Sequence, residues 1–277
     1  MNRLKSLFIS FYLTLLSVGV ARALWLLSEQ SAWTWVIVAL APGLAFFAWV
    51  FTFNVARTGY VSLVMWVGPM AALSGMLVTA MPLLEIWVWV LGVGLLGATV
   101  YIRWYSVFEA RDSEMLRKGN LLPDELEFED EQGTLVSLKE FKGPLLLLFY
   151  RGNWCPLCMA QIREVAEQYA ELAAKGLTLL MISPQSHNNT ASLARKFDVP
   201  MKFLVDKDLH AAKTLGIEAM GGLPVGLEAL GYDSDTVMPT VIITDADHRV
   251  LYADQTDNYR VRPEPATFLR VLSEAGL

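Results

Sequence analysis

Four long apolar runs dominate the first hundred residues of this 277-residue chain. Each run has about 20 residues, the length that an α-helix needs to cross a hydrocarbon core of about 30 Å. Eight of the nine tryptophans lie in this part, several near the ends of the runs, where aromatic side chains mark membrane interfaces. The sequence therefore predicts a transmembrane region over residues 1–104. Its four helices are expected at about 7–27, 33–53, 61–81 and 84–104.

Basic residues predict how these helices are oriented. Arg3 and Lys5 precede the first run, Arg57 lies between the second and third, and Arg103 ends the fourth, whereas the other two loops contain no Lys or Arg. Because cytoplasmic loops are enriched in Lys and Arg, we expect a multi-pass cell (plasma or inner) membrane protein. The C-terminal part is then cytoplasmic, where two cysteines suit a reducing compartment.

The first run has a competing interpretation as a signal peptide, with a cleavage site at Ala21-Arg22-Ala23. The apolar stretch continues past that site to Leu27, which favours a membrane helix. Arg22 is then a charge inside the membrane or a snorkelling side chain. The region contains no cysteine or histidine, so an anchor is the simplest role. Small residues suited to close helix packing are Gly92, Gly94, Gly97 and Ala98.

The two cysteines of the chain, Cys155 and Cys158, are spaced C-x-x-C at the junction of a predicted strand and a predicted helix. Residues 145–150 are all apolar, and apolar residues recur every three or four positions from 162 to 172. A thiol at a helix N-terminus has a lowered pKa, and Arg151 adds a nearby positive charge. This pattern predicts a redox-active dithiol in which one cysteine attacks and the other resolves the mixed disulfide.

Other roles for the cysteine pair are less favourable. A zinc site needs four ligands, and His187, His210 and His248 are scattered without ligand spacing, so we expect no metal. A structural disulfide that closes so short a loop restrains little chain entropy. No nucleotide or cofactor motif is present, and the three histidines are expected in surface positions or turns.

Residues 154–158, W-C-P-L-C, resemble the W-C-x-x-C site of thioredoxin-like proteins, and Val237-Met238-Pro239-Thr240 resembles their cis-proline loop. The domain around them is similar to the AhpC/TSA peroxiredoxin-like family, through the hairpin residues 126–143 and the Phe-Tyr at 149–150. The resemblance covers residues 119–277 and implies an α/β thioredoxin-fold domain. It implies catalytic roles for Cys155 and Cys158. Supporting roles fall to Arg151, Trp154, Pro156, Pro239 and Thr240. Charged residues, among them Glu109 and Arg111, predict a polar linker at 105–118, with a helical continuation of the fourth run as the alternative.

The two templates assign the cysteines differently. In the peroxiredoxin register Cys158 is the peroxidatic position, but Arg151 replaces a proline, Cys155 a threonine and Met238 the arginine that polarises the peroxide. In the thioredoxin register Cys155 is the exposed attacking thiol and Cys158 the buried resolving one. Peroxide reduction needs preorganised donors, whereas exchange needs an accessible thiolate, so we favour exchange.

The expected function is thus a membrane-anchored thiol-disulfide oxidoreductase. A peroxiredoxin-like thiol peroxidase acting on hydrogen or alkyl peroxides is the alternative, and a membrane scaffold or redox sensor is a third reading of another class. Expected partners are a protein thiol or disulfide or a peroxide, a thiol reductant such as thioredoxin or glutathione, and the lipid bilayer.

Charge and pattern complete the expectations for the second half. Residues 1–103 hold five of the 22 Lys and Arg and two of the 28 Asp and Glu, so the remainder is strongly acidic and unsuited to nucleic acid. Residues 254–265 resemble the segment before the last helix in relatives with a C-P-x-C site. A solvated turn is favoured for Arg260 and Arg262, and the alternative is that one of them reaches the active site. Residues 221–226 are expected in a flexible insertion. Predicted strands are 177–183, 203–206, 240–244 and 249–253, and predicted helices 190–197, 210–215 and 265–275.

Overall fold

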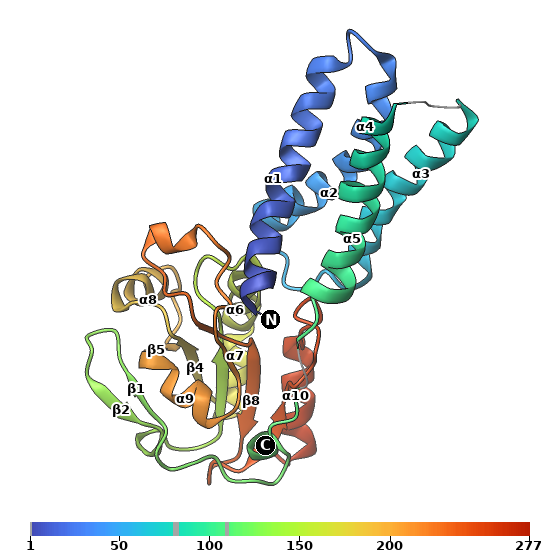
Figure 1. Cartoon of the computed structure of the whole chain (residues 1–277). Coiled ribbons are helices and arrows are strands. Elements are labelled where there is room, and N and C mark those ends of the chain that lie inside the picture. The colour runs from blue at the N-terminus through green and yellow to red at the C-terminus, as the bar shows by residue number, and fades with distance from the viewer. Residues whose placement is uncertain (1, 80–82, 109–110) are drawn as a thin grey trace.

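The computed structural model describes residues 2–79, 83–108 and 111–277, and it has two parts (Figure 1). A bundle of long helices forms one part, and an α/β domain lies at one end of that bundle. The N-terminus of α1 and the C-terminal end of the fourth long helix both meet the α/β domain. The loop between α1 and α2 lies at the opposite end of the bundle.

Four helical segments of the bundle are long and apolar enough to cross a membrane, as predicted. The end of the predicted third run, at 80–81, lies outside the described residues. The fourth segment is wound as a π-helix over two stretches. The elements are α1 (Asn2–Leu26), η1 (Ser31–Trp33) with α2 (Thr34–Phe53), η2 (Gly59–Leu63) with α3 (Val64–Val78), and α4 (Leu84–Trp87), η3 (Val88–Leu96), α5 (Gly97–Val100) and η4 (Tyr101–Tyr105).

Small residues bring the fourth segment close to its neighbours at two of the predicted positions. A Cβ added to Gly97 would lie 2.4 Å from the Tyr12 ring, and one added to Gly94 would lie 3.1 Å from Pro69. Ala98 is buried as well. The prediction is wrong for Gly92, where a Cβ would meet no described atom within 4 Å.

Arg22 is neither alone nor buried. Its guanidinium lies 2.8 Å from the Glu85 carboxylate, and both side chains are about half exposed. The guanidinium also lies over the Trp33 ring, 5.4 Å from its centroid. The sequence did not reveal this pair because Glu85 belongs to the fourth segment, at the end of the bundle far from the α/β domain (Figure 1).

The α/β domain is built on one mixed sheet with the order β2-β1-β5-β4-β3-β8-β9. The central strands β3, β4 and β5 are parallel, while β8 runs antiparallel to β3. All five residues of β3 are buried, as its apolar run predicts. The strands are β1 (Glu127–Glu129), β2 (Leu135–Ser137), β3 (Leu145–Phe149), β4 (Thr178–Ser183), β5 (Lys202–Val205), β8 (Thr240–Thr244) and β9 (Val250–Ala253).

Helices cover both faces of this sheet. Leu146 and Leu148 of β3 belong to one apolar core with residues of α6 and α10, whereas Leu145 and Leu147 belong to a second core with α9. This alternation follows from the period of two in a strand. The helices are α6 (Pro156–Glu167), α7 (Tyr169–Ala174), α8 (His187–Ala194), α9 (His210–Thr214) and α10 (Pro265–Glu274). Short elements are η5 (Glu114–Leu116), η6 (Leu138–Glu140), η7 (Lys207–Leu209) and η8 (Leu227–Leu230), with the hairpin β6 (Glu218–Ala219) and β7 (Thr236–Val237).

The predicted linker at 105–118 packs onto the α/β domain instead of hanging free. The Phe108 N–H donates to the Asp257 carbonyl at 2.5 Å, and Leu116 is buried in a domain core. Glu109, counted in the linker, lies outside the described residues. A row of charges suggests a solvated segment, but the apolar residues between those charges decide the packing here.

Two arginines, the partly buried Arg57 and the buried Arg260, join the bundle to the domain. Arg57, in the loop before α3, donates to both Glu164 carboxylate oxygens of α6 at 2.8 and 2.6 Å. Arg260 donates to the Gly59 carbonyl at 2.9 Å and to the Ile102 carbonyl at 3.4 Å. The expectation of a solvated turn is therefore wrong for Arg260, because carbonyls of the bundle replace its water.

Candidate functional site

The cysteine pair lies where β3 passes into α6. Cys155 caps α6 with extended backbone (φ −91°, ψ 107°), Pro156 is the first helical residue and Cys158 the third. Proline suits that first position because its fixed φ is helical and its missing N–H has no partner there anyway. The Cys155 carbonyl accepts from the N–H groups of Cys158 and Met159, each at 3.1 Å. Both cysteines are free thiols, at the predicted place.

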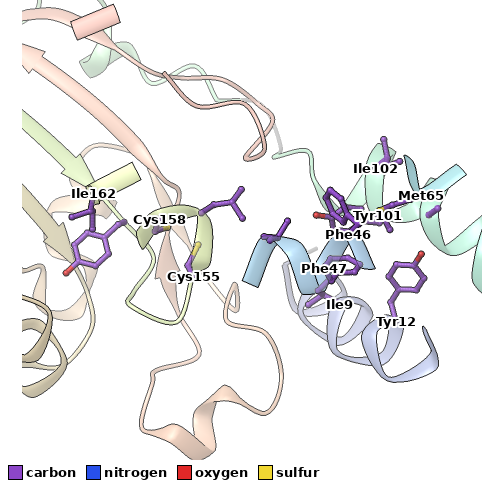
Figure 2. Close-up of a cluster of buried hydrophobic side chains, with 14 of the residues drawn as sticks. Ile9, Tyr12, Phe46, Phe47, Met65, Tyr101, Ile102, Cys155, Cys158 and Ile162 are labelled. Atoms are coloured by element: carbon purple, nitrogen blue, oxygen red, sulfur yellow. The ribbon is translucent and has the colours of Figure 1, made fainter. Parts of the chain in front are cut away.

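The two thiols differ in access. Cys158 is completely buried and Cys155 is 5% exposed, so the expectation of an exposed Cys155 is wrong. Figure 2 shows the pair at the start of α6, on the side of the domain that faces the aromatic cluster of the bundle. The bundle itself covers Cys155, and a sequence pattern within the domain cannot reveal that.

Arg262 is the charged partner of Cys158. Both terminal guanidinium nitrogens lie 3.6 Å from the Cys158 Sγ atom, and the side chain is buried. The same guanidinium donates to the Gln161 amide oxygen at 2.9 Å and to the Tyr259 carbonyl at 3.1 Å. The expected solvated turn is therefore wrong for Arg262 too. The less favoured alternative, that Arg260 or Arg262 reaches the active site, holds for Arg262, whose partner lies about a hundred residues earlier.

The surroundings of the two thiols shift their pKa values in opposite directions. Burial raises the pKa of Cys158, but the hydrogen bond from Cys155 and the positive charge of Arg262 lower it by more. The hydrogen bond to Cys158 and burial raise the pKa of Cys155. Cys158 is thus the thiolate and Cys155 the thiol. This reverses the order expected for a thiol at the helix terminus, because Cys158 receives both the Cys155 hydrogen bond and the contact with Arg262.

The loop before the cysteines is held in a fixed shape. Arg151 stacks on Trp154, with the guanidinium carbon 4.7 Å from the ring centroid. Gly152 has φ 146°, and a Cβ there would lie 2.6 Å from the Trp154 indole nitrogen, so only glycine fits. The Asn153 N–H donates to the Gln185 side-chain oxygen at 2.9 Å. Arg151 and Trp154, both predicted as supporting residues, therefore lie against each other in the lining of the cavity that contains Cys155.

Pro239 and Thr240 lie at the same end of the sheet, where Thr240 pairs with Phe149. None of the peptide bonds between described residues is cis, so the predicted cis-proline is wrong. Sequence alone does not decide this, because cis and trans X-Pro bonds differ by only about 1 kcal/mol. Both residues instead hold Arg111, whose guanidinium donates to the Pro239 carbonyl at 3.2 Å and to the Thr240 hydroxyl at 2.5 Å. Sequence reasoning missed Arg111 because it counted as linker charge.

A cavity of about 240 Å³ lies in front of Cys155, between the domain and the bundle. The domain contributes the active-site loop, the insertion before β7 and Tyr259, while α1, α2 and η4 form the opposite wall. The insertion predicted as flexible is thus part of the site, and its Val225 carbonyl accepts from Ser10 of α1 at 2.8 Å. The lining residues are Ile9, Ser10, Leu13, Phe47, Val50, Phe51, Tyr101, Tyr105, Arg151, Trp154, Cys155, Pro156, Leu157, Pro224, Val225, Leu227 and Tyr259.

The histidines stand apart from this cavity. His187 lies 2.9 Å from the Glu129 carboxylate, and His248 contacts the Phe141 carbonyl at 3.1 Å. Within the described residues no three His, Cys, Asp or Glu side chains gather as metal ligands would. Thiol chemistry at Cys155 and Cys158 is therefore what this site offers.

Comparison with known proteins identifies relatives of the α/β domain. The AhpC/TSA family model matches residues 119–253, which include both cysteines. This part of the chain is an AhpC/TSA domain. The AhpC/TSA domain is similar to "Peroxiredoxin Q, chloroplastic" of Sedum lineare, 29% identical over 122 residues, which are 43% of this chain and 65% of that protein. It is also similar to "Thiol-disulfide oxidoreductase ResA" of Bacillus cereus, 24% identical over 125 residues, 45% of this chain and 69% of that protein.

Among solved structures, the AhpC/TSA domain resembles Peroxidoxin BcpB from Mycobacterium tuberculosis, with 21% identity and a TM-score of 0.46, over 57% of this chain and 97% of that chain. The chain covers between 50% and 65% of the length of two peroxiredoxin Q relatives. The matched family segment begins at residue 119, after the helical bundle.

Proposed function

We propose that this protein is a membrane-anchored thiol-disulfide oxidoreductase that cycles Cys155 and Cys158 between dithiol and disulfide. The observation that carries the proposal is the unequal setting of the thiols. Cys155 lies at the cavity wall, whereas Cys158 lies behind it against the Arg262 guanidinium. A relative named as a thiol-disulfide oxidoreductase supports this assignment.

The geometry supports a sequence of two exchanges. The Cys155 proton passes to Cys158 along their hydrogen bond, and the Cys155 thiolate then attacks a sulfur of the partner disulfide. This forms a mixed disulfide and expels one partner thiolate. Cys158 then loses its proton, with Arg262 stabilising the charge, and attacks the Cys155 sulfur. The second partner thiolate leaves, and the internal disulfide remains.

A thiol peroxidase is the second candidate, and Arg262 is the observation that favours it. In the peroxiredoxin register Cys158 is the peroxidatic cysteine, and the uncharged Met238 takes the position of the usual arginine. Arg262 supplies a guanidinium to Cys158 in its place. The Cys158 thiolate would attack the peroxide O–O bond to give a sulfenic acid and an alcohol or water. The Cys155 thiol would then condense with it, releasing water. The complete burial of Cys158 disfavours this order of attack.

We propose further that the four long helices cross a cell membrane and that the AhpC/TSA domain lies in the cytoplasm. Arg3, Arg57 and Arg103 belong to the end of the bundle that meets the domain, which fits the bias of basic residues toward the cytoplasm. Reporter fusions after residues 30, 58 and 277 test this orientation. Cytoplasmic signal from the first of these, or periplasmic signal from the last, would contradict it.

The test of the proposed activity uses the full chain in lipid nanodiscs. The reduced protein is mixed anaerobically with a protein disulfide or with hydrogen peroxide, and thiol loss is followed by alkylation and mass spectrometry. Exchange predicts fast loss with the protein disulfide, a trapped mixed disulfide on Cys155 in Cys158→Ser, and no turnover in Cys155→Ser. Fast loss with peroxide and slow loss with the disulfide would favour the peroxidase. Two thiols inert to both would favour a scaffold.

A further inference from the structure

The cavity in front of Cys155 is built by both parts of the chain. Its bundle wall comes from α1, α2 and η4, at the end of the helices that are long enough to cross a membrane. Phe51 of this wall is 54% exposed, so the cavity has accessible apolar surface on its bundle side. With the bundle in a membrane, as proposed above, a small apolar molecule would reach Cys155 from the lipid phase.

The insertion before β7 closes another side of the cavity. Ser6 and Ser10 of α1 donate to the carbonyls of Leu223 and Val225, so this insertion is fastened to the bundle. Only 5% of the Cys155 surface remains exposed. These contacts leave room at Cys155 for a compact group, either a small molecule or a disulfide on an extended protein segment, and not for a folded protein surface.

The lining indicates the shape of that compact group. Six of its side chains are aromatic and come from both walls, and such faces stack on a planar ring at centroid distances of about 4.5–7 Å. A volume of about 240 Å³ is below the usual range for drug-sized ligands of about 300–1,000 Å³, and it suits one substituted ring. The aromatic lining residues are Phe47, Phe51, Tyr101, Tyr105, Trp154 and Tyr259.

One cationic donor lines the same cavity. The Arg151 guanidinium lies over Trp154, beside Cys155, and is the charged side chain among the lining residues. A ring carbonyl oxygen that gains negative charge would be stabilised by such a fixed donor in an apolar surrounding.

We propose that this cavity takes the ring of a lipid-dissolved quinone, which accepts two electrons from the Cys155–Cys158 dithiol. This rests on the proposed dithiol–disulfide cycle and membrane placement, and it names a second electron acceptor besides a protein disulfide. The Cys155 thiolate bonds to a ring carbon, and the Cys158 thiolate then attacks the Cys155 sulfur. The S–S bond forms as the C–S bond breaks. The ring leaves with two electrons and the two thiol protons, as a hydroquinone.

The test uses the full chain in nanodiscs, reduced and free of oxygen, with a decyl-substituted benzoquinone as the probe. Quinone absorbance and free thiols are followed together. Leu13→Trp places an indole in the cavity, while Leu15→Trp puts the same side chain at a half-buried position of α1 outside the lining. We expect one quinone consumed for each disulfide formed, and a rate that falls by at least about tenfold in Leu13→Trp because the ring is excluded. Leu15→Trp should react like the wild type.

Two further oxidants separate the possible failures. A protein disulfide should oxidise Leu15→Trp at the wild-type rate. If the protein disulfide oxidises the wild type but the quinone does not, the quinone assignment is wrong and the exchange activity stands. A lipid hydroperoxide that reacts faster than the quinone would also overturn the assignment. Thiols inert to every oxidant would refute the proposed cycle and the acceptor together.

Discussion

Removing the Arg262 charge should raise the pKa of Cys158. Both terminal nitrogens lie 3.6 Å from Sγ, so at an effective dielectric of 20 the attraction is at most about 4.6 kcal/mol. That corresponds to about 3 pKa units at 1.36 kcal/mol each. Because the charge is spread over the guanidinium and water can partly replace it, we expect about 2 units in Arg262→Gln. The pKa of Cys158, which the site lowers to about 5, would then rise to about 7.

The assay is a pH titration of thiolate ultraviolet absorbance in the full chain. It is run in a Cys155→Ser background, so that one thiol titrates and the serine hydroxyl can still donate to it. Arg163→Gln is the matched control, because Arg163 is exposed on the same helix and makes no described contact with either cysteine. A midpoint that moves by less than about half a unit in Arg262→Gln would refute the electrostatic reasoning.

Three further predictions follow from described contacts. The lowered pKa of Cys158 means that its thiolate stabilises the fold fully above the unfolded pKa of about 8.5, and that this stabilisation is lost as pH falls through about 5. The melting temperature of the wild type should therefore rise with pH across this window. The rise should be smaller in Cys158→Ser. Gly97→Ala should lower the free energy of unfolding by about 1–3 kcal/mol, because the added Cβ would clash with the Tyr12 ring. Gly92→Ala should change the melting temperature little. Glu164→Gln, which breaks the half-buried ion pair with Arg57, should lower the free energy of unfolding by up to about 1 kcal/mol. If that difference from the wild type persists unchanged at high salt, its origin is not ionic.

Local patterns were sufficient to predict most elements. The apolar runs of the first hundred residues and the strand at 145–149 are long, uniform signals, and each produced the expected element. The C-x-x-C spacing placed both cysteines at the start of α6 for the same reason, because a strand-to-helix change is visible within about 15 residues of sequence.

What the sequence missed depends on partners far along the chain. Arg260 and Arg262 read as a solvated turn because charged residues are seldom buried, yet one meets carbonyls of the bundle and the other meets Cys158. The same distance effect hid the cover over Cys155 and the anchoring of Arg111. Gly92 and Gly97 share one sequence context, and only the neighbouring helix distinguishes them.

The shared cavity changes what counts as the smallest working unit of this protein. A fragment that begins at residue 119 keeps both cysteines and Arg262, but it loses every cavity residue that α1, α2 and η4 contribute. Leu157 and Tyr259 would then face water, which invites self-association. Such a fragment would report the intrinsic chemistry of the dithiol and not its choice of substrate. If the cavity selects the substrate as proposed, selectivity belongs to the bundle and the AhpC/TSA domain together, whereas thiol reactivity belongs to the domain.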